Sequence, residues 1–314
     1  MEIKEVKTRD EWNSLFRLTK KMNISQDWDY GLFRELSSDI LVKRYKIIHK
    51  NNEVAIFQLF QKKIKYFKFL KLFYLNRGPL IIDQSVSYEL VLNKISKFFS
   101  ISRGQFFLIN PFKSLNDNIK KILKKNFYFG FKSGIYETSY IDLLEDIEVL
   151  RSNLHSKWRN QLVKSEKNKI EISIYDNDQK LDFILSSYNE MINKKNFAGL
   201  SITELKTLFK IYIKEKKFVS LIVSDENKNI IGFTILLTFS KSSLYFIGWA
   251  NDKGRRFNVS NLLLWNSIVY LKEKKFNEFD LGGYDSKNLP GIASFKKRMG
   301  GLQVKYTEKW LKLY

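Results

Sequence analysis

Cysteine is absent from this 314-residue chain, and only two histidines are present, His49 and His155. The absence of cysteine excludes disulfides, thiolate nucleophiles and cysteine-ligated metal sites. A histidine-rich metal site is excluded as well, and a Ser-His-Asp triad would have to use one of these two residues. His49 ends a strand-like run and His155 lies in a basic helical stretch, so a solvated surface position is the simpler interpretation of both.

Long hydrophobic runs are also missing. No apolar segment reaches the roughly 20 residues that a membrane-spanning helix needs. Residues 1–20 are charged throughout and do not resemble a secretory signal. We therefore expect a cytoplasmic protein.

Acidic residues are few relative to basic ones. Lysine and arginine total 55 and aspartate and glutamate total 33, which gives a formal net charge of +22. A field of this sign attracts polyanions, among them RNA, anionic lipid headgroups and phosphorylated substrates, without indicating which one. Peripheral contact with the inner face of an anionic plasma membrane is compatible with the same charge.

Strands and helices alternate along the first half of the chain. Residues 41–49 and 54–61 have the period-two pattern of paired strands, and residues 50–52 form a polar turn between them. The other elements expected there are a helix, a strand, a helix and a buried strand, at residues 11–20, 67–75, 86–99 and 106–109.

The second half repeats this order. Long antiparallel strands are expected at residues 230–239 and 243–250, followed by a polar break, a helix and a short strand at residues 251–256, 262–271 and 278–281. Strands, a break, a helix and a short strand thus occur twice, at residues 54–111 and 230–283, although the two sequences are not alike. Helices are also expected at residues 178–193 and 202–213, and a strand at residues 219–223. This rhythm predicts an α/β (α+β) protein built from two copies of one unit.

The boundary between the two units is predicted near Asp142. Residues 136–141 are strand-like, and residues 143–169 are largely helical with an apolar stripe at a spacing of four. We therefore expect domains at residues 1–142 and 143–314, with the last strand free to pack back on the first domain.

Six short segments occur in the order of the motifs of one known family. They are residues 25–31 (Ser-Gln-Asp-Trp-Asp-Tyr-Gly), Arg77-Gly78-Pro79, residues 107–111 (Phe-Leu-Ile-Asn-Pro), residues 138–143 with Lys157-Trp158-Arg159-Asn160, residues 279–283 (Phe-Asp-Leu-Gly-Gly) and residues 294–301. In these segments the chain resembles the FemABX family, the non-ribosomal aminoacyltransferases that build peptidoglycan cross-bridges. The resemblance implies two tandem acetyltransferase-like (GNAT-like) domains. The long coiled-coil arm of many members is missing, so the chain looks like the shorter FemX-type members.

The resemblance also implies a reaction. An amine of a peptidoglycan precursor would attack the aminoacyl ester of an aminoacyl-tRNA, which is a co-substrate, and no cofactor would be needed. The ester carbonyl develops negative charge, which a fixed cation or N–H donors can stabilise. Because no protein nucleophile is required, this chemistry suits a chain without cysteine and almost without histidine.

Lys296 is the predicted catalytic residue. The family has a lysine after phenylalanine in this motif, near the reacting ends of donor and acceptor, so Phe295 is a predicted substrate contact. The ammonium of Lys296 would stabilise the oxyanion or bind the terminal carboxylate of the acceptor. The competing interpretation is that Lys296-Lys297-Arg298 is an ordinary basic helix surface.

Four residues of the first half are predicted to bind the acceptor. Arg77 lies beside a Gly-Pro turn, where its guanidinium would meet an anion bidentately, unless it is merely solvated. Trp28 and Tyr30 would wall the acceptor site, although aromatic residues there are also typical of a core. Asn110 stands where the family motif has aspartate, so a carboxylate that could bind or deprotonate an amine is missing.

Two aromatic residues of the second half are further candidates for substrate binding. Tyr245 and Trp249 are four residues apart on the strand that faces the central cleft in GNAT-like folds. Residues an even number apart on a regular strand point the same way, so both side chains are expected on one face. Packing is the competing role for both.

The nature of the donor depends on residues 255–260. Acetyl-CoA-dependent members of the GNAT class use Arg/Gln-x-x-Gly-x-Gly/Ala here, because glycines let backbone N–H groups approach a pyrophosphate at a helix N-terminus. This chain has Asn258 and Ser260 at the two glycine positions, which favours aminoacyl-tRNA. Five basic residues are then predicted to hold the acceptor end of the tRNA: Lys253, Arg255, Arg256, Lys297 and Arg298.

Three interpretations stay open. The first is an aminoacyl-tRNA-dependent transferase, expected to be a monomer, acting on a nucleotide- or lipid-linked cell-wall precursor. Leu32 stands where arm-less family members have a lysine for the sugar-nucleotide phosphates, and Arg34 or Arg44 would have to replace it. The second is an acyl-CoA-dependent N-acyltransferase acting on an amino sugar or a polyamine. The third is a non-catalytic protein that binds RNA or membranes through its charge.

Overall fold

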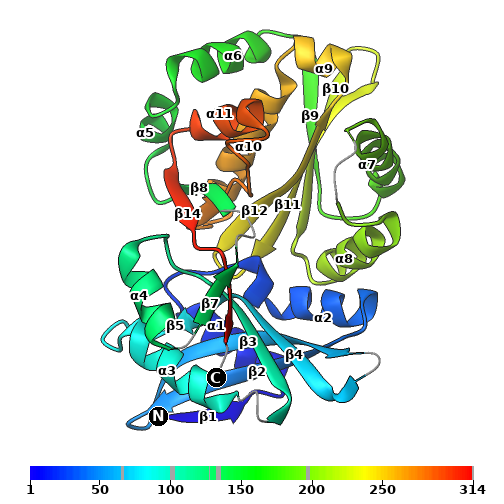
Figure 1. Ribbon diagram of the computed structural model, residues 1–314. Helices are drawn as coiled ribbons and strands as arrows, with labels where there is room; N and C mark the ends of the chain where they lie inside the picture. Colours follow the sequence, from blue (N-terminus) through cyan, green and yellow to red (C-terminus); the bar gives the residue numbers. More distant parts are fainter. Residues whose placement is uncertain (65–66, 100–102, 127, 132–135, 196–198, 313–314) are drawn as a thin grey trace. The chain divides into compact units, whose positions relative to one another are not determined.

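The computed structural model describes residues 1–64, 67–99, 103–126, 128–131, 136–195 and 199–312. The chain forms two compact units, the first made of Met1–Tyr136 and Lys305–Tyr314 and the second of Glu137–Val304. Each unit is a mixed β-sheet covered by helices (Figure 1). The sequence places the boundary after Asp142, whereas the second unit begins at Glu137, so the strand at residues 136–142 lies almost wholly in the second unit.

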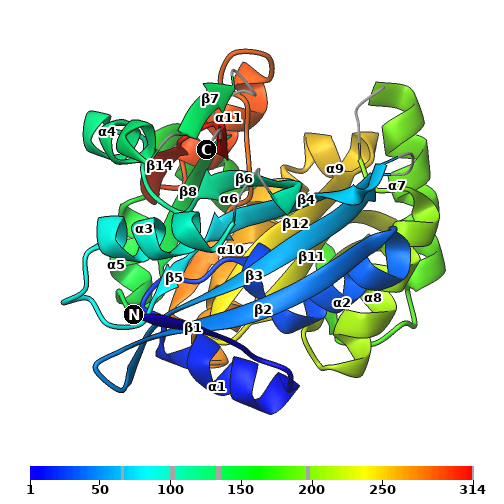
Figure 2. The same ribbon diagram turned by 60° about the horizontal axis from the view of Figure 1, so that its bottom comes forward.

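The sheet of the first unit has the order β1-β2-β3-β4-β6-β15-β7, with β5 paired to β3. Figure 2 shows β1 to β4 side by side. The strands are β1 (Glu2–Glu5), β2 (Ile40–His49), β3 (Asn52–Ile64), β4 (Phe67–Gly78), β5 (Leu80–Ile81), β6 (Gln105–Pro111), β7 (Tyr128–Phe131) and β15 (Lys309–Lys312). The helices are α1 (Arg9–Leu18), the 3₁₀ turn η1 (Ile24–Gln26), α2 (Trp28–Ser37), α3 (Tyr88–Phe98) and α4 (Asp117–Lys125).

Local chemistry explains these elements. Lys50 and Asn51 have φ values of 48° and 65°, the left-handed conformation that a tight hairpin turn between β2 and β3 requires. The side chains of Ser87 and Asn116 cap α3 and α4 by accepting hydrogen bonds from the third amide of each helix. Phe57 and Leu59 occupy alternate positions of β3, so their side chains point to the same face of the sheet, and both are completely buried.

The sheet of the second unit has the order β14-β8-β13-β12-β11-β10-β9. The strands are β8 (Tyr136–Asp142), β9 (Ile170–Tyr175), β10 (Phe218–Asp225), β11 (Ile230–Phe239), β12 (Ser242–Ala250), β13 (Glu278–Asp280) and β14 (Leu302–Tyr306). The helices are α5 (Ile147–Ser152), α6 (Ser156–Glu166), α7 (Leu181–Lys195), α8 (Ile202–Lys214), α9 (Asp252–Arg256), α10 (Val259–Glu273) and α11 (Pro290–Lys297). Helices α7 and α8 cover one face of the sheet, and α10 with α6 covers the other (Figure 1).

The two sheets correspond strand by strand. In each, an antiparallel pair is followed by a helix and a parallel strand: β3-β4-α3-β6 in the first unit and β11-β12-α10-β13 in the second. A strand from the end of the chain, β15, lies beside β6, and β8 occupies the matching place beside β13. Lys312 anchors β15, because its buried ammonium donates to the carbonyls of Ser96 and Phe99. The predicted α/β architecture of two copies of one unit is confirmed.

Three local predictions need correction. The apolar stripe of residues 143–169 is buried, but it belongs to two helices, because the chain turns at residues 153–155 and His155 caps α6. The predicted polar break at residues 251–256 is the short helix α9. The strand predicted at residues 67–75 is longer, since β4 continues to Gly78 with Arg77 at a φ of 51°. Among the described residues, no helix is long and apolar enough to span a membrane.

Candidate active site

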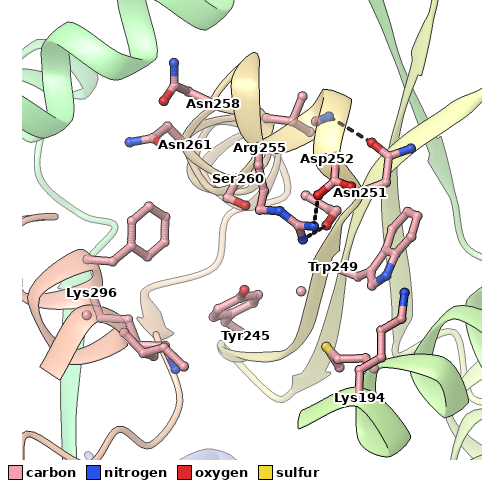
Figure 3. A pocket seen from close by; sticks show the side chains of 18 of the residues that line it. Lys194, Tyr245, Trp249, Asn251, Asp252, Arg255, Asn258, Ser260, Asn261 and Lys296 are labelled. Carbon is pink, nitrogen blue, oxygen red and sulfur yellow. Dashed lines mark hydrogen bonds and ion pairs between the residues drawn. The ribbon is translucent and has the colours of Figure 1, made fainter. Parts of the chain in front are cut away.

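A cavity of ≈ 630 Å³ lies within the second unit (Figure 3). Its walls come from α7, β12, the α9–α10 segment and α11. Five of the residues predicted for function line it: Tyr245, Trp249, Arg255, Phe295 and Lys296. The structure therefore brings together predicted residues that are distant in sequence, since Tyr245 and Lys296 are 51 positions apart.

The sheet itself opens the cavity. Strand β12 pairs with β13 only from Ser242 to Leu244, and β13 ends at Asp280. From Tyr245 onward, the edge of β12 that faced β13 lines the cavity instead. Splayed strands leave backbone N–H and C=O groups that need partners, so a ligand can complete the hydrogen bonding there.

A β-bulge in β12 changes the predicted direction of two side chains. The partner of Leu236 is Tyr245 while the partner of Ile235 is Ile247, so Phe246 is the extra residue. Tyr245 therefore shares a face with Gly248, and Trp249 points to the other face. The prediction that Tyr245 and Trp249 lie on one face is wrong because the bulge shifts the alternation between them.

The two aromatic residues have different surroundings. Trp249 stacks on Phe233, with ring centroids 5.4 Å apart, and meets the edge of Phe183 from α7 at 5.7 Å. The hydroxyl of Tyr245 lies so close to Gly248 that a Cβ at that position would be 1.9 Å from it. Burial raises the pKa of Tyr245 to about 12, so its hydroxyl stays protonated at physiological pH.

Lys296 is a buried cation in this cavity rather than part of a basic helix surface. Its side chain reaches the turn after β13, where Nζ donates to the carbonyl oxygens of Gly283 at 3.0 Å and Gly282 at 3.2 Å. The ring centroid of Tyr245 lies 5.1 Å from the ammonium (Figure 3). Lys296 is only 8% exposed. The ammonium is thus held in one place by acceptors that do not carry a full negative charge.

Burial and one carboxylate set the proton affinity of Lys296. Desolvation lowers its pKa to about 8, and the charge of Asp280 partly opposes that effect. Asp280 is itself buried, which raises the pKa of its carboxyl group. Its carboxylate accepts from the Thr138 hydroxyl at 2.5 Å and the Gly282 amide at 2.9 Å. Thr138 on β8 therefore helps to position the turn that holds Lys296.

Gly282 is required by this turn. Its φ is +71°, and a Cβ would lie 2.7 Å from the carbonyl oxygen of Tyr245. We expect Gly282→Ala to lower the free energy of unfolding by about 2 kcal/mol or more, because both the strained φ and the backbone clash must be relieved. Urea denaturation measures this change. Gly291→Ala is the matched control, since a Cβ there meets nothing within 4 Å; equal stability of the two variants would show that the turn has no such constraint.

The start of α10 forms another wall of the cavity. Asn258 has a φ of 54°, so it supplies the left-handed conformation expected from its tolerance of that region. Arg255 donates to the carbonyl oxygen of Ala250 at 2.6 Å and also pairs with Asp252 (Figure 3). A Cβ on Gly254 would lie 2.1 Å from the carbonyl oxygen of Ile231, so the backbone packs tightly against β11 here. The first turn of α10 places the positive end of its dipole at the cavity.

The other predicted tRNA contacts are not in the cavity lining. Lys253 forms an ion pair with Asp225 at 2.7 Å. Lys297 pairs with Glu137 at 3.4 Å and donates to Ser286 at 2.8 Å. Arg256 is exposed and Arg298 is half-buried. Only Arg255 of the five therefore lies at the cavity itself.

The candidates of the first unit form a separate group. Arg77 is buried, with its guanidinium 4.6 Å from the ring centroid of Tyr136 and 4.3 Å from that of Tyr306. Its Nη1 donates to Asn110 Oδ1 at 3.1 Å, so these two predicted residues are in direct contact. The alternative of a solvated Arg77 is excluded by its burial.

Trp28 and Tyr30 pack against neighbouring side chains of the first unit. The guanidinium of Arg44 lies 3.6 Å from the ring centroid of Trp28 and donates to its carbonyl oxygen at 3.1 Å. Tyr30 makes edge contacts with Phe33 and Phe60. Arg44 is buried against Trp28, which leaves Arg34 as the more accessible of the two replacements considered for the missing lysine.

Sequence reasoning missed several residues that shape the cavity. Lys194 and Glu190 of α7 line it, although nothing in the sequence of that helix distinguishes them from other surface charges. Asp280 is part of the Phe-Asp-Leu-Gly-Gly segment, and its place at a strand end before two glycines was the signal available. Nothing in the sequence indicated Gly248. Its lack of a side chain leaves room for the Tyr245 hydroxyl, and that contact depends on the bulge at Phe246.

The fold is that of two tandem acetyltransferase-like (GNAT-like) units, each with a parallel strand pair beside a helix. The structure of FemX has this fold, with a TM-score of 0.84 and 13% sequence identity over 100% of this chain and 98% of that one. The twin GNAT-like fold expected from the sequence motifs is confirmed. Within the described residues the longest helices, α7 and α10, have 15 residues each.

Two other solved structures share the fold more distantly. The C-terminal domain of a putative lysylphosphatidylglycerol synthetase from Agrobacterium fabrum has a TM-score of 0.58 and 10% identity, over 98% of this chain and 92% of that one. A tandem GNAT protein from the clavulanic acid biosynthesis pathway has a TM-score of 0.57 and 9% identity, over 99% of this chain and 97% of that one. No family model matches the chain, and a search of curated proteins found no match.

Proposed function

We propose that this protein transfers an amino acid from aminoacyl-tRNA to an amine of a peptidoglycan precursor, with the reacting ester held in the cavity of the second unit. The observation that carries the proposal is the buried ammonium of Lys296, fixed by two carbonyl oxygens at the wall of a cavity large enough for an aminoacylated nucleotide end. The fold of FemX supports the same assignment.

The reaction needs little beyond positioning and charge. The neutral amine of the acceptor attacks the ester carbonyl, a C–N bond forms, and the C–O bond to the tRNA ribose breaks. The proton lost by the amine leaves with the ribose oxygen. The carbonyl oxygen bears negative charge in between, and the buried ammonium of Lys296 would stabilise it. A lysine that can approach neutrality near pH 8 could also relay the proton.

Two features support tRNA as the donor. Asn258 and Ser260 stand where acetyl-CoA-dependent enzymes have glycines, and both line the cavity at the start of α10. Arg255 lies at the cavity, and Arg256 is exposed beside it for contact with a phosphate backbone. We place the protein in the cytoplasm, as a monomer that can touch an anionic membrane, because its charge and its substrates suit that compartment.

One observation favours a second candidate function. The N-terminus of α10 lies at the cavity wall, as it would in a transferase that binds the pyrophosphate of acyl-CoA, and a tandem GNAT protein shares the fold. An acyl-CoA-dependent N-acyltransferase acting on an amino sugar or a polyamine is therefore the alternative.

Incubation with labelled aminoacyl-tRNA and, in parallel, labelled acetyl-CoA separates the two functions. We expect label to reach peptidoglycan precursors from aminoacyl-tRNA only. We also expect tRNA affinity to fall at least tenfold between about 50 and 200 mM salt, because several phosphate contacts release counterions. Label transferred from acetyl-CoA alone would overturn the donor assignment, and muropeptides unchanged by deletion of the gene would overturn the acceptor assignment.

A further inference from the structure

A second cavity, of ≈ 450 Å³, lies within the first unit and has no part in the proposed transfer. It is situated just beyond the carboxyl ends of the parallel strands β4 and β6, which end at Gly78 and Pro111. Ligands of α/β proteins bind preferentially outside the carboxyl ends of parallel strands. The position of this cavity is therefore one where the fold favours a binding site.

The internal repeat gives the position a counterpart. In the second unit, the cavity touches the first residue of α10 and the helix that follows the parallel strand, α11. In the first unit, the cavity touches Tyr88, the first residue of α3, and the start of α4, which follows the parallel strand β6. One difference is that β4 stays paired with β6 up to Gly78 and Pro111, so this cavity lies past the strand ends rather than between the strands.

The lining of the second cavity is cationic. It contains Lys20, Lys21 and Lys113 and no acidic residue. Partial burial lowers the pKa of Lys113, and repulsion by Lys21, which lines the same cavity, lowers it further. Among the described residues, neither Lys21 nor Lys113 forms an ion pair with a carboxylate. Like charges that converge on one cavity without a carboxylate are stabilised when an anion binds between them.

The rest of the lining suits an organic molecule. The ring of Tyr88 lies under the ammonium of Lys113, 5.1 Å from it, and Leu80, Phe112 and Ile119 add buried apolar surface. The amide of Asn118 and the positive end of α4, a helix of nine residues, face the same space. Apolar walls with a few convergent polar groups are the usual composition of a small-molecule site.

We propose that this cavity is a second ligand site, for an organic phosphate whose charged group meets Lys21 and Lys113 and whose ring contacts Phe112 and Tyr88. Its lining shares no residue with that of the cavity that contains Lys296. It does not depend on the identity of the acyl donor, so the two proposals can fail independently.

Isothermal titration calorimetry with three probes tests the site: inorganic pyrophosphate, ADP and UDP. The informative variant is the double substitution Lys21→Glu with Lys113→Glu, which reverses both charges at positions that are exposed enough to leave the fold intact. The matched control is Lys97→Glu, an exposed lysine in the last turn of α3 that does not line the cavity. Thermal unfolding of each variant verifies that it is folded.

We expect saturable binding of at least one nucleoside diphosphate, weakened at least tenfold by the double variant and less than twofold by Lys97→Glu. We also expect pyrophosphate to bind more weakly than that nucleotide. Equal weakening by the control would mean that the charge of the whole molecule, not the cavity, attracts the probe, and the site would be rejected. Loss of binding in Arg255→Glu instead would assign the heat to the other cavity, and binding only to vesicles of anionic lipid would indicate a membrane surface; each of these results would overturn the proposal.

Discussion

Lys296→Met is expected to make the protein more stable and at least tenfold less active. Burial lowers the pKa of the ammonium from 10.5 to about 8. At neutral pH this shift reduces the free energy of unfolding by about 3 kcal/mol, because the charged form is disfavoured in the folded state. Methionine has a similar length and no charge to desolvate, so part of that energy is regained. The carbonyl oxygens of Gly282 and Gly283 lose a donor, which reduces the gain, and we expect a net increase of about 1–2 kcal/mol.

The sign of this effect can be verified by titration. A lysine whose pKa is lower in the folded state than in the unfolded state binds fewer protons when folded between pH 8 and 10.5. The free energy of unfolding therefore increases as the pH rises from 8 to 10.5, because the cost of burying the charged lysine disappears. Lys296→Met should remove this rise. Urea denaturation of both proteins at pH 7 and pH 10 measures it, and a parallel dependence in the two would show that Lys296 does not carry the cost.

Turnover should change in the opposite direction. Without a fixed cation at the cavity wall, we expect transfer to slow at least tenfold, or about 1.4 kcal/mol in activation free energy. The control is Lys274→Met, which removes the charge of an exposed lysine at the end of α10. A stable variant with full activity would exclude Lys296 from the mechanism, while a variant that loses stability would show that its ammonium contributes to the fold.

This opposition between stability and function could not be read from the sequence. The motif around Lys296 indicated the residue, and the motif was sufficient because Phe295 and Lys296 do line the cavity. Its ammonium, however, is held by a turn that a distant strand contacts, because Thr138 from β8 donates to Asp280 across 142 positions of sequence. The competing interpretation of a basic helix surface fails at Lys296, because its ammonium donates to the carbonyl oxygens of the turn at Gly282 and Gly283.

The strands were predictable for a local reason and the cavity was not. Alternation along residues 41–61 specifies a hairpin, and the structure pairs Leu41 with Gln61 and Tyr45 with Phe57 as that pattern requires. The opening beside Tyr245 arises from where β13 ends, and the face of Trp249 arises from the bulge at Phe246. Both are set by strand pairing at a distance, which periodicity within one strand does not report.

Basic residues show the same limit. Lys253, Arg255 and Arg256 are adjacent in sequence and were predicted as one group that contacts tRNA. In the structure Lys253 is paired with Asp225, Arg255 lies at the cavity and Arg256 is exposed. The sequence shows that Lys253 is positively charged, but it does not show that Asp225 of another strand, β10, pairs with that charge.

Asp280→Asn is expected to shift the pH dependence of transfer. The carboxylate of Asp280 raises the pKa of Lys296 against the desolvation that lowers it. Removal of that charge while the Thr138 and Gly282 contacts keep a hydrogen-bonding oxygen should lower the pKa of Lys296 further. If the cationic form is the active one, transfer declines above a pH of about 8 in the original protein and at a lower pH in the variant.

The ratio of the two rates at each pH isolates this effect, because ionisation of the acceptor amine acts equally on both. We expect a ratio near one at pH 6 and about one-tenth at pH 9, where the lysine of the variant has lost most of its protons. Asp280 would then be a positioning residue that acts through Lys296 and not on the substrate. A ratio that is low but constant with pH would mean that the substitution only disturbs the turn. A ratio well above one at pH 6 that falls toward one at pH 9 would mean that neutral Lys296, acting as a general base, is the active form, because the variant then has more of its lysine neutral at low pH.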